Sequence, residues 1–186
     1  MADYQLVKGR PESGEGRTER EMRVYDLLDE LGMEYWRTDH PDAEANTMEA
    51  CAEIDRVLGA TVVKNLFLTN RQHTDYYLLL MPGDKVFKTK EITKQIGSAR
   101  LSFGSGEEME QFLNCHPGSA SVLGLMNDKD NRVRLLVDQD VLQGEFLGAH
   151  PCMNTSSLKL RTAEVFGVFL EKVHHAMTVV ELHGEE

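Results

Sequence analysis

A run of apolar and β-branched residues at positions 61–69 predicts a buried β-strand near the middle of the chain. Side chains alternate along a strand, so Lys64 shares one face with Val62, Leu66 and Leu68. Because these neighbours are apolar, we expect Lys64 to point toward the interior or into a pocket, where an unpaired ammonium is costly. Either a carboxylate neutralises it or it lines a cavity and meets a ligand. The alternative is a structural salt bridge, or a lysine that extends to solvent at a sheet edge.

Capping motifs on both sides of this strand predict helices. Thr18 with Glu21 and Ser105 with Glu108 have the spacing of a capping box, and apolar residues recur at helical intervals after each. Glycine marks several helix ends. The expected helices begin at Thr18, Asn46, Thr89, Ser105 and Thr162, and the first three end at Gly32, Gly59 and Gly97.

Further strands are predicted at residues 34–38, 75–81, 86–87, 100–103, 132–138, 156–160 and 177–182. Consecutive strands are mostly too close in sequence for helical crossovers. The expected fold class is therefore α+β, a mixed and largely antiparallel sheet with helices packed around it. Residues 1–17 are polar and rich in glycine, so we expect a flexible N-terminal leader followed by a single domain at residues 18–186.

Charge and composition narrow the range of partners. The net charge of −11 argues against generic binding of DNA or other nucleic acid by charge alone. The sequence has no apolar run of membrane-spanning length and no start of signal-peptide type, so the cytoplasm is the expected location. Its three cysteines lack a CxxC pair, which makes a disulfide framework unexpected.

Positive charge is concentrated in one segment, residues 85–100. Five basic residues against the single acidic residue Glu91 leave a local charge of about +4. This segment is a candidate for a local basic face, and a solvated helix face is the alternative. The basic residues are Lys85, Lys88, Lys90, Lys94 and Arg100.

The loop at residues 117–124 is rich in small residues, including Gly118, Ser119 and Ser121. Such a loop lets backbone N–H groups approach an anion or a carbonyl oxygen, although an ordinary turn has the same composition. The GxSxG spacing of a serine hydrolase is absent. His150 precedes a proline and a polar loop that contains Asn154, but a lone histidine is more often structural.

Other chemistry is poorly supported by the sequence. Cys115, His116, His150 and Cys152 are spaced unsuitably for tetrahedral zinc. Neither a Walker A motif nor GxGxxG is present, so no metal and no cofactor are expected. His174 and His175 are expected at the surface.

Five stretches in this order resemble the YbaK/ProX family of aminoacyl-tRNA deacylases. These proteins are free-standing relatives of the editing domain in bacterial prolyl-tRNA synthetases. The stretches are residues 64–68, 96–103, 117–125 followed by Asn127 and Asp128, 132–138, and His150-Pro151 with Asn154. The resemblance covers roughly residues 20–182 and implies a partly barrel-like α+β fold. The ProX-type subgroup implies removal of alanine from mischarged tRNA for proline, with prolyl-tRNA synthetase as a further candidate partner.

The resemblance also implies roles for particular residues. Lys64 falls on the family's pocket lysine and His150 on the histidine of its HP motif, which makes them the candidate catalytic residues. The candidate substrate-binding residues are Asn65, Gly118, Ser119, Ser121 and Asn154. With tRNA as the implied substrate, the five basic residues of the 85–100 segment become the candidate contacts for its acceptor stem. The turn at residues 39–41 resembles a second HP motif, but residues 42–49 depart from the family pattern. A cysteinyl, seryl or 2-aminobutyryl ester therefore stays open as the substrate, and so does a non-catalytic tRNA-binding module.

Overall fold

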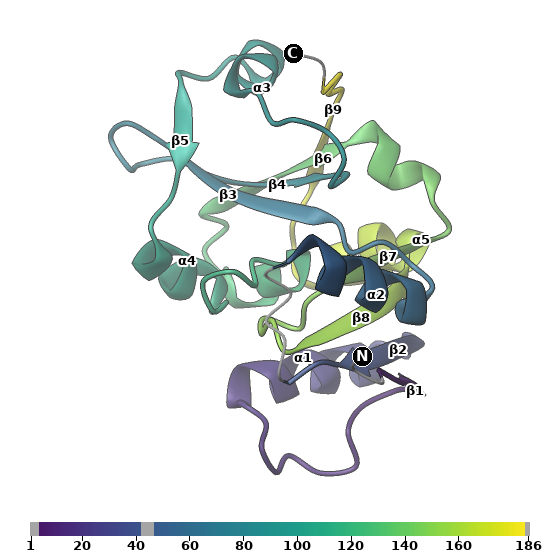
Figure 1. The fold of residues 1–186 in the computed structure, drawn as a ribbon. Helices are drawn as coiled ribbons and strands as arrows, with labels where there is room; N and C mark the ends of the chain where they lie inside the picture. The colour runs from purple at the N-terminus through teal and green to yellow at the C-terminus, as the bar shows by residue number, and fades with distance from the viewer. Residues whose placement is uncertain (1–3, 42–46, 185–186) are drawn as a thin grey trace.

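The computed structural model describes residues 4–41 and 47–184, and within them the strands form two sheets (Figure 1). The first sheet is antiparallel, in the order β1 (Leu6–Lys8), β2 (Tyr35–Asp39), β8 (Ser156–Arg161) and β7 (Phe146–Ala149). The second is ordered β5 (Leu101–Phe103), β3 (Lys64–Asn70), β4 (Tyr76–Met81), β6 (Val133–Asp138) and β9 (Met177–Val180). Its β4–β6 and β6–β9 pairs are parallel and the others antiparallel.

Helices surround both sheets. They are α1 (Glu19–Glu30), α2 (Met48–Leu58), α3 (Thr89–Ile96), α4 (Gly106–Leu113), the 3₁₀ helices η1 (Val122–Asn127) and η2 (Gln139–Gln143), and a continuous C-terminal helix. The last comprises α5 (Thr162–Glu164), the π-helical turn η3 (Val165–Phe169) and α6 (Leu170–Lys172). In Figure 1, α1 lies against the four-stranded sheet and α3 beyond the five-stranded sheet. None of the helices in the described part of the chain has the length and apolar composition needed to cross a bilayer.

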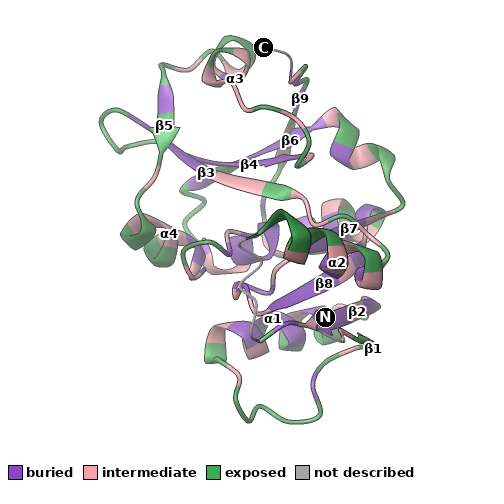
Figure 2. Ribbon diagram, viewed as in Figure 1, coloured by how far each residue is buried: buried purple, intermediate pink, exposed green. Residues whose placement is uncertain are grey.

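Strand β4 is buried on both faces, and this divides the interior into two cores (Figure 2). Its residues Leu78 and Leu80 belong to the larger core, which also contains Leu158 of the four-stranded sheet. The intervening residue Leu79 lies in a smaller core with Ile92 of α3. Because side chains alternate along a strand, the continuous apolar run of β4 serves both cores.

The α+β class and the mixed, largely antiparallel pairing are confirmed, but several local predictions are wrong. The capping box at Ser105 forms with Glu108 as predicted. Helix α3 is capped by Lys88, whereas the hydroxyl of Thr89 donates to the carbonyl of Leu101 at 3.1 Å. No strand forms at residues 86–87. The predicted cap Asn46 lies outside the described residues, and the N-cap of α2 is Thr47.

The expected flexible leader contains a strand. β1 pairs with β2 in a register that places Leu6 opposite Thr38 and Lys8 opposite Trp36. At the end of the leader, Arg17 forms an ion pair with Asp39 at 2.9 Å. Backbone pairing with the edge of β2 and this ion pair hold residues whose composition alone indicated a loose arm.

Candidate active site

The start of β3 lies directly beside β7. Val63 donates its N–H to the carbonyl of Gly148 at 3.1 Å, and Gly148 donates to the carbonyl of Thr61 at 2.9 Å. A Cβ at position 148 would lie 2.8 Å from the Cα of Val62, so the close approach requires glycine. These contacts place the beginning of the lysine-bearing strand next to the strand that ends just before His150.

Two loops that are distant in sequence form a single unit near this junction. His116 donates its N–H to the carbonyl of Cys152 at 3.1 Å. The buried hydroxyl of Ser119 lies 2.6 Å from the carbonyl of His116 and 2.9 Å from that of Cys152. Gly118 has φ +92°, and a Cβ there would lie 3.4 Å from the amide nitrogen of Asn154. The fold therefore brings together the predicted small-residue loop and the predicted histidine loop.

The hydrogen bond of His150 fixes its tautomer. Its Nδ1 lies 3.0 Å from the carbonyl oxygen of Ser156, and because a carbonyl only accepts, Nδ1 must carry the hydrogen. Burial lowers the pKa of this histidine below its ordinary value, although the bond to Ser156 opposes the shift. The ring is therefore neutral at pH 7 and Nε2 carries the lone pair. Such a nitrogen can accept a proton or a hydrogen bond from water or a hydroxyl group.

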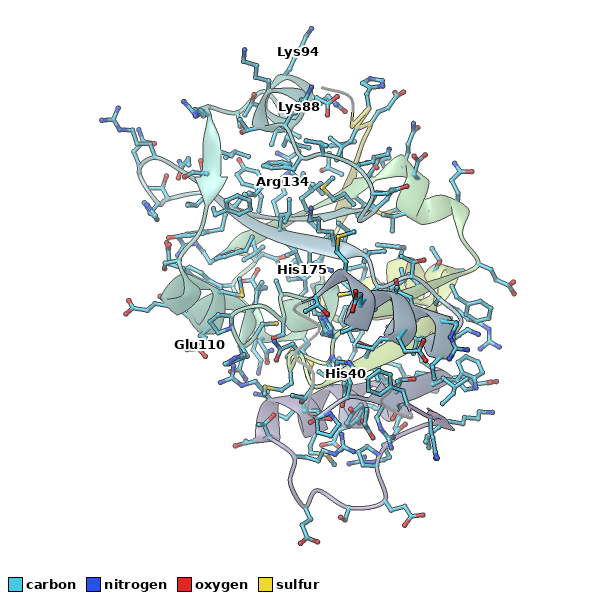
Figure 3. The ribbon with its side chains drawn as sticks, in the orientation of Figure 1. His40, Lys88, Lys94, Glu110, Arg134 and His175 are labelled. Carbon is cyan, nitrogen blue, oxygen red and sulfur yellow. The ribbon has the colours of Figure 1, made fainter. Side chains whose placement is uncertain are left out.

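Behind His150 lies a second histidine whose role the sequence did not reveal. Nε2 of the buried His40 lies 2.9 Å from the hydroxyl of Ser157, which is 3.4 Å from Nδ1 of His150. The two imidazole rings are 6.3 Å apart in an edge-to-face arrangement. The signals available were the His-Pro turn at residues 40–41 and the polar pair at the start of β8. Figure 3 shows His40 in the half of the molecule that contains the four-stranded sheet.

The position of Lys64 differs from the predicted interior one. It is the first residue of β3 and its side chain is exposed, whereas the apolar neighbours on its face indicated an interior position. The strand begins at residue 64 rather than 61, so the lysine lies at the end of the sheet, where its ammonium reaches solvent. Its ammonium group forms no hydrogen bond or ion pair with any residue in ranges 4–41 and 47–184.

Asn65, the next residue, points an unsatisfied acceptor into the protein. Its amide nitrogen donates to the carbonyl of Val63 at 3.0 Å. Its Oδ1 is buried and has no hydrogen-bond partner among the residues that the structure describes. A buried acceptor without a donor is costly, so this oxygen is a candidate contact for a ligand N–H group.

The serines of the small-residue loop hold the loop itself. Ser121 caps η1, and its hydroxyl accepts from the N–H of Leu123 at 3.1 Å. The N–H of Ser119 donates to the carbonyl of His116 at 2.8 Å and is not available for an oxyanion. The backbone N–H groups of Gly118 and Ser121 have no such bond to a described residue. They are the better candidates for binding a developing negative charge.

The basic segment divides into two parts. The ammonium of Lys85 lies 2.7 Å from both Asp138 and Asp140 and also donates to the carbonyl of Leu182, so its charge is neutralised within the fold. This bonding argues against its predicted contact with tRNA. Lys88 is partly buried, and the remaining basic residues, Lys90, Lys94 and Arg100, are exposed. Figure 3 shows Lys94 projecting outward from α3, toward the opposite end of the view from His40.

The two buried cysteines near the loops are poor metal ligands. The interaction with Cys115 and burial both raise the pKa of Cys152 well above its ordinary value, which keeps the thiol protonated. In the part of the chain that the structure describes, no three His, Cys, Asp or Glu side chains are grouped so as to hold a metal ion. His175 also differs from prediction, because it is buried and lies 3.0 Å from a carboxylate oxygen of Asp128.

Comparison with known proteins assigns these features to one family. Residues 42–167 match the sequence profile of the aminoacyl-tRNA editing domain. The chain is 29% identical over 133 residues to the prolyl-tRNA editing protein ProX of Acetoanaerobium sticklandii, covering 72% of this chain and 80% of the relative. It is 28% identical over 169 residues to the prolyl-tRNA synthetase associated domain-containing protein 1 of Xenopus laevis, covering 89% and 97%.

A solved structure of a candidate trans-editing enzyme for prolyl tRNA synthetase has the same fold. It superposes with a TM-score of 0.65 at 17% identity, over 88% of this chain and 98% of that chain. The profile match covers more than half of the sequence and includes the small-residue loop and His150. This chain therefore belongs to the aminoacyl-tRNA editing domain family.

Proposed function

We propose that this protein is a trans-editing hydrolase that deacylates mischarged tRNA for proline, and that alanine is the amino acid removed. The observation that carries the proposal is the neutral His150, held in one tautomer beside the glycine-containing loop and the start of β3. Membership in the aminoacyl-tRNA editing domain family and similarity to a prolyl-tRNA editing protein support the reaction class and the tRNA.

The reaction is hydrolysis of the ester between the amino acid and the terminal ribose. Water adds to the ester carbonyl, the ribose oxygen leaves with a proton, and free alanine and tRNA result. We assign the positioning of water to Nε2 of His150, with help from the neighbouring ribose hydroxyl, because an aminoacyl ester is labile enough to need no stronger base. The N–H groups of Gly118 and Ser121 would stabilise the tetrahedral oxyanion.

Two residues at the start of β3 would hold the substrate. The exposed ammonium of Lys64 would bind the ester carbonyl or a phosphate of the terminal nucleotide by a charge-assisted hydrogen bond. The buried Oδ1 of Asn65 would accept a hydrogen bond from the α-ammonium group of the amino acid, and Asn154 would line the same pocket beside Gly118. These assignments rest on the exposed ammonium of Lys64 and the buried Oδ1 of Asn65, which have no partner among the described residues.

Discrimination against the correct amino acid would rest on size. A pocket that accepts the methyl group of alanine and excludes the proline ring rejects prolyl-tRNA by steric conflict. The tRNA is the primary partner, with Lys88, Lys90, Lys94 and Arg100 assigned to its acceptor end and prolyl-tRNA synthetase as a further partner. The proposed location is the cytoplasm, where aminoacylated tRNA is made and used.

The test is release of free alanine from purified alanyl-tRNA for proline, with prolyl-tRNA as the expected non-substrate. Hydrolysis of the alanyl ester well above its uncatalysed rate is the expected result. An alanyl ester that decays at the same rate with and without the protein would overturn the proposal.

A further inference from the structure

Two phenylalanine rings meet on the surface at the edge of the five-stranded sheet. The side chain of Phe103 on the edge strand β5 is 62% exposed, which is high for an aromatic residue in a strand. The ring of Phe87 lies 6.0 Å from it, centroid to centroid, and itself packs against the smaller core. One ring is therefore anchored and the other presents its surface to solvent.

This aromatic pair lies on the same face of the sheet as Lys64. Phe103 is directly opposite Leu68 in the antiparallel β3–β5 pair, so their side chains point to the same face. Lys64 lies four positions before Leu68 and shares that face by alternation. At a rise of about 3.3 Å per residue, the lysine and the aromatic pair are about 13 Å apart along the strand.

Basic residues are next to both ring-bearing segments in the sequence. Lys88 follows Phe87 directly, and Arg100 immediately precedes β5. The hydrogen bond from Thr89 to the carbonyl of Leu101 holds the start of α3 against β5, so the two segments that carry Lys88 and Arg100 lie side by side. Residues 88–100 carry four basic residues against one acidic residue, in a chain whose net charge is −11.

We propose that Phe103 and Phe87 form a stacking site for an unpaired base at the 3′ end of the tRNA, with Lys88 and Arg100 binding the adjacent phosphates. This inference rests on the proposed function. Exposed aromatic rings beside cations are the combination that binds single-stranded nucleic acid, because every base offers a face for stacking and every nucleotide a phosphate. A protein interface is the weaker alternative, because lysine is depleted from such interfaces.

The distance between Lys64 and the aromatic pair indicates which base of the unpaired 3′ end would be bound. If Lys64 holds the terminal nucleotide, a site about 13 Å away is farther than one stacked step of about 3.4 Å. The stacked base is therefore one that precedes the aminoacylated adenosine. The aromatic pair would align the unpaired end so that the ester enters the site between β3 and His150.

The test compares Phe103→Ala, Phe103→Tyr and Val179→Ala on two substrates, alanyl-tRNA for proline and the alanyl ester of adenosine. Val179 is a matched control, because it is 50% exposed on β9 and apolar. We expect Phe103→Ala to lower kcat/KM on the tRNA roughly tenfold and to leave hydrolysis of the adenosine ester unchanged. Phe103→Tyr keeps the ring and should retain activity, and Val179→Ala should behave as the wild type.

Unchanged tRNA kinetics for Phe103→Ala would overturn the inference, and so would an equal loss on both substrates. If the wild type hydrolyses neither ester, the proposed function is wrong. The stacking site is then tested separately, by measuring the affinity of the wild type and of Phe103→Ala for uncharged tRNA. Weaker binding by Phe103→Ala to intact tRNA, but not to tRNA trimmed of its unpaired end, would support it. Equal binding would overturn it, as would a dimer that Phe103→Ala dissociates without loss of tRNA affinity.

Discussion

The hydroxyl of Ser119 lies 2.9 Å from the carbonyl oxygen of Cys152, across a sequence separation of 33 residues. This contact and the hydrogen bond from His116 to the same carbonyl join the small-residue loop to the loop that follows His150. In the proposed mechanism, the relative position of the candidate oxyanion-binding N–H groups and His150 therefore depends on Ser119, which is assigned no part in the reaction itself.

Ser119→Ala is expected to lower both stability and activity. Loss of a buried hydroxyl that bonds two carbonyl oxygens should reduce the free energy of unfolding by about 1–2 kcal/mol, measured by urea denaturation. Deacylation should fall as well, because the two loops are no longer held together. Ser102→Ala is the control, since Ser102 is exposed on β5. Equal stability of the two variants would show that the Ser119 contact contributes nothing.

Deacylation is expected to decrease in acid as His150 becomes protonated. Its pKa is lowered by burial, so the inflection in kcat/KM should lie below the ordinary histidine value of about 6.5. In His150→Gln the inflection should disappear and the rate above it should fall. An unchanged pH profile in that variant would exclude His150 as the group that positions water.

The buried pair His175 and Asp128 is expected to make stability depend on pH. Burial lowers the pKa of His175, but the hydrogen bond to Asp128 outweighs it and the net pKa is raised. The contribution of a group whose folded pKa is raised is fully present below its unfolded pKa and is lost as pH rises through the folded value. The stability advantage of the wild type over His175→Gln should therefore shrink as pH increases above about 6.5. A difference that is constant from about pH 6 to 9 in urea titrations would contradict this.

Lys85 is expected to contribute to stability and Lys90 to tRNA binding. Lys85→Met leaves the carboxylate of the fully buried Asp138 without its cation and should cost about 3 kcal/mol of stability. Lys90→Met removes an exposed charge and should change stability by less than about 0.5 kcal/mol. The Lys90 variant should instead reduce the salt dependence of tRNA binding, by slightly less than one unit in the slope of log affinity against log salt. A stable Lys85 variant with weakened tRNA binding would reverse these assignments.

The pattern of the sequence predicts the α+β class, most strand positions and the loops of the candidate site, because these depend on local periodicity and turn chemistry. The pattern does not predict the environment of a side chain that is determined by contacts with residues distant in the sequence. The ion pair of Lys85 with Asp138 and the hydrogen bond of the buried His175 depend on carboxylates 53 and 47 residues away. The exposure of Lys64 depends on where backbone pairing with β4 begins, and alternation of residues cannot locate that point.

The most direct test of the proposed function is deacylation of alanyl-, cysteinyl-, seryl- and prolyl-tRNA for proline by the wild type, by Lys64→Ala and by Lys64→Arg. We expect rapid loss of alanine alone, a loss of activity of about a hundredfold or more in Lys64→Ala, and partial retention in Lys64→Arg, which keeps the positive charge. Rapid loss of another amino acid would keep the chemistry and contradict the assigned substrate. Full activity of Lys64→Ala would contradict the role assigned to Lys64. Hydrolysis of none of the four esters by the wild type would contradict the proposed function.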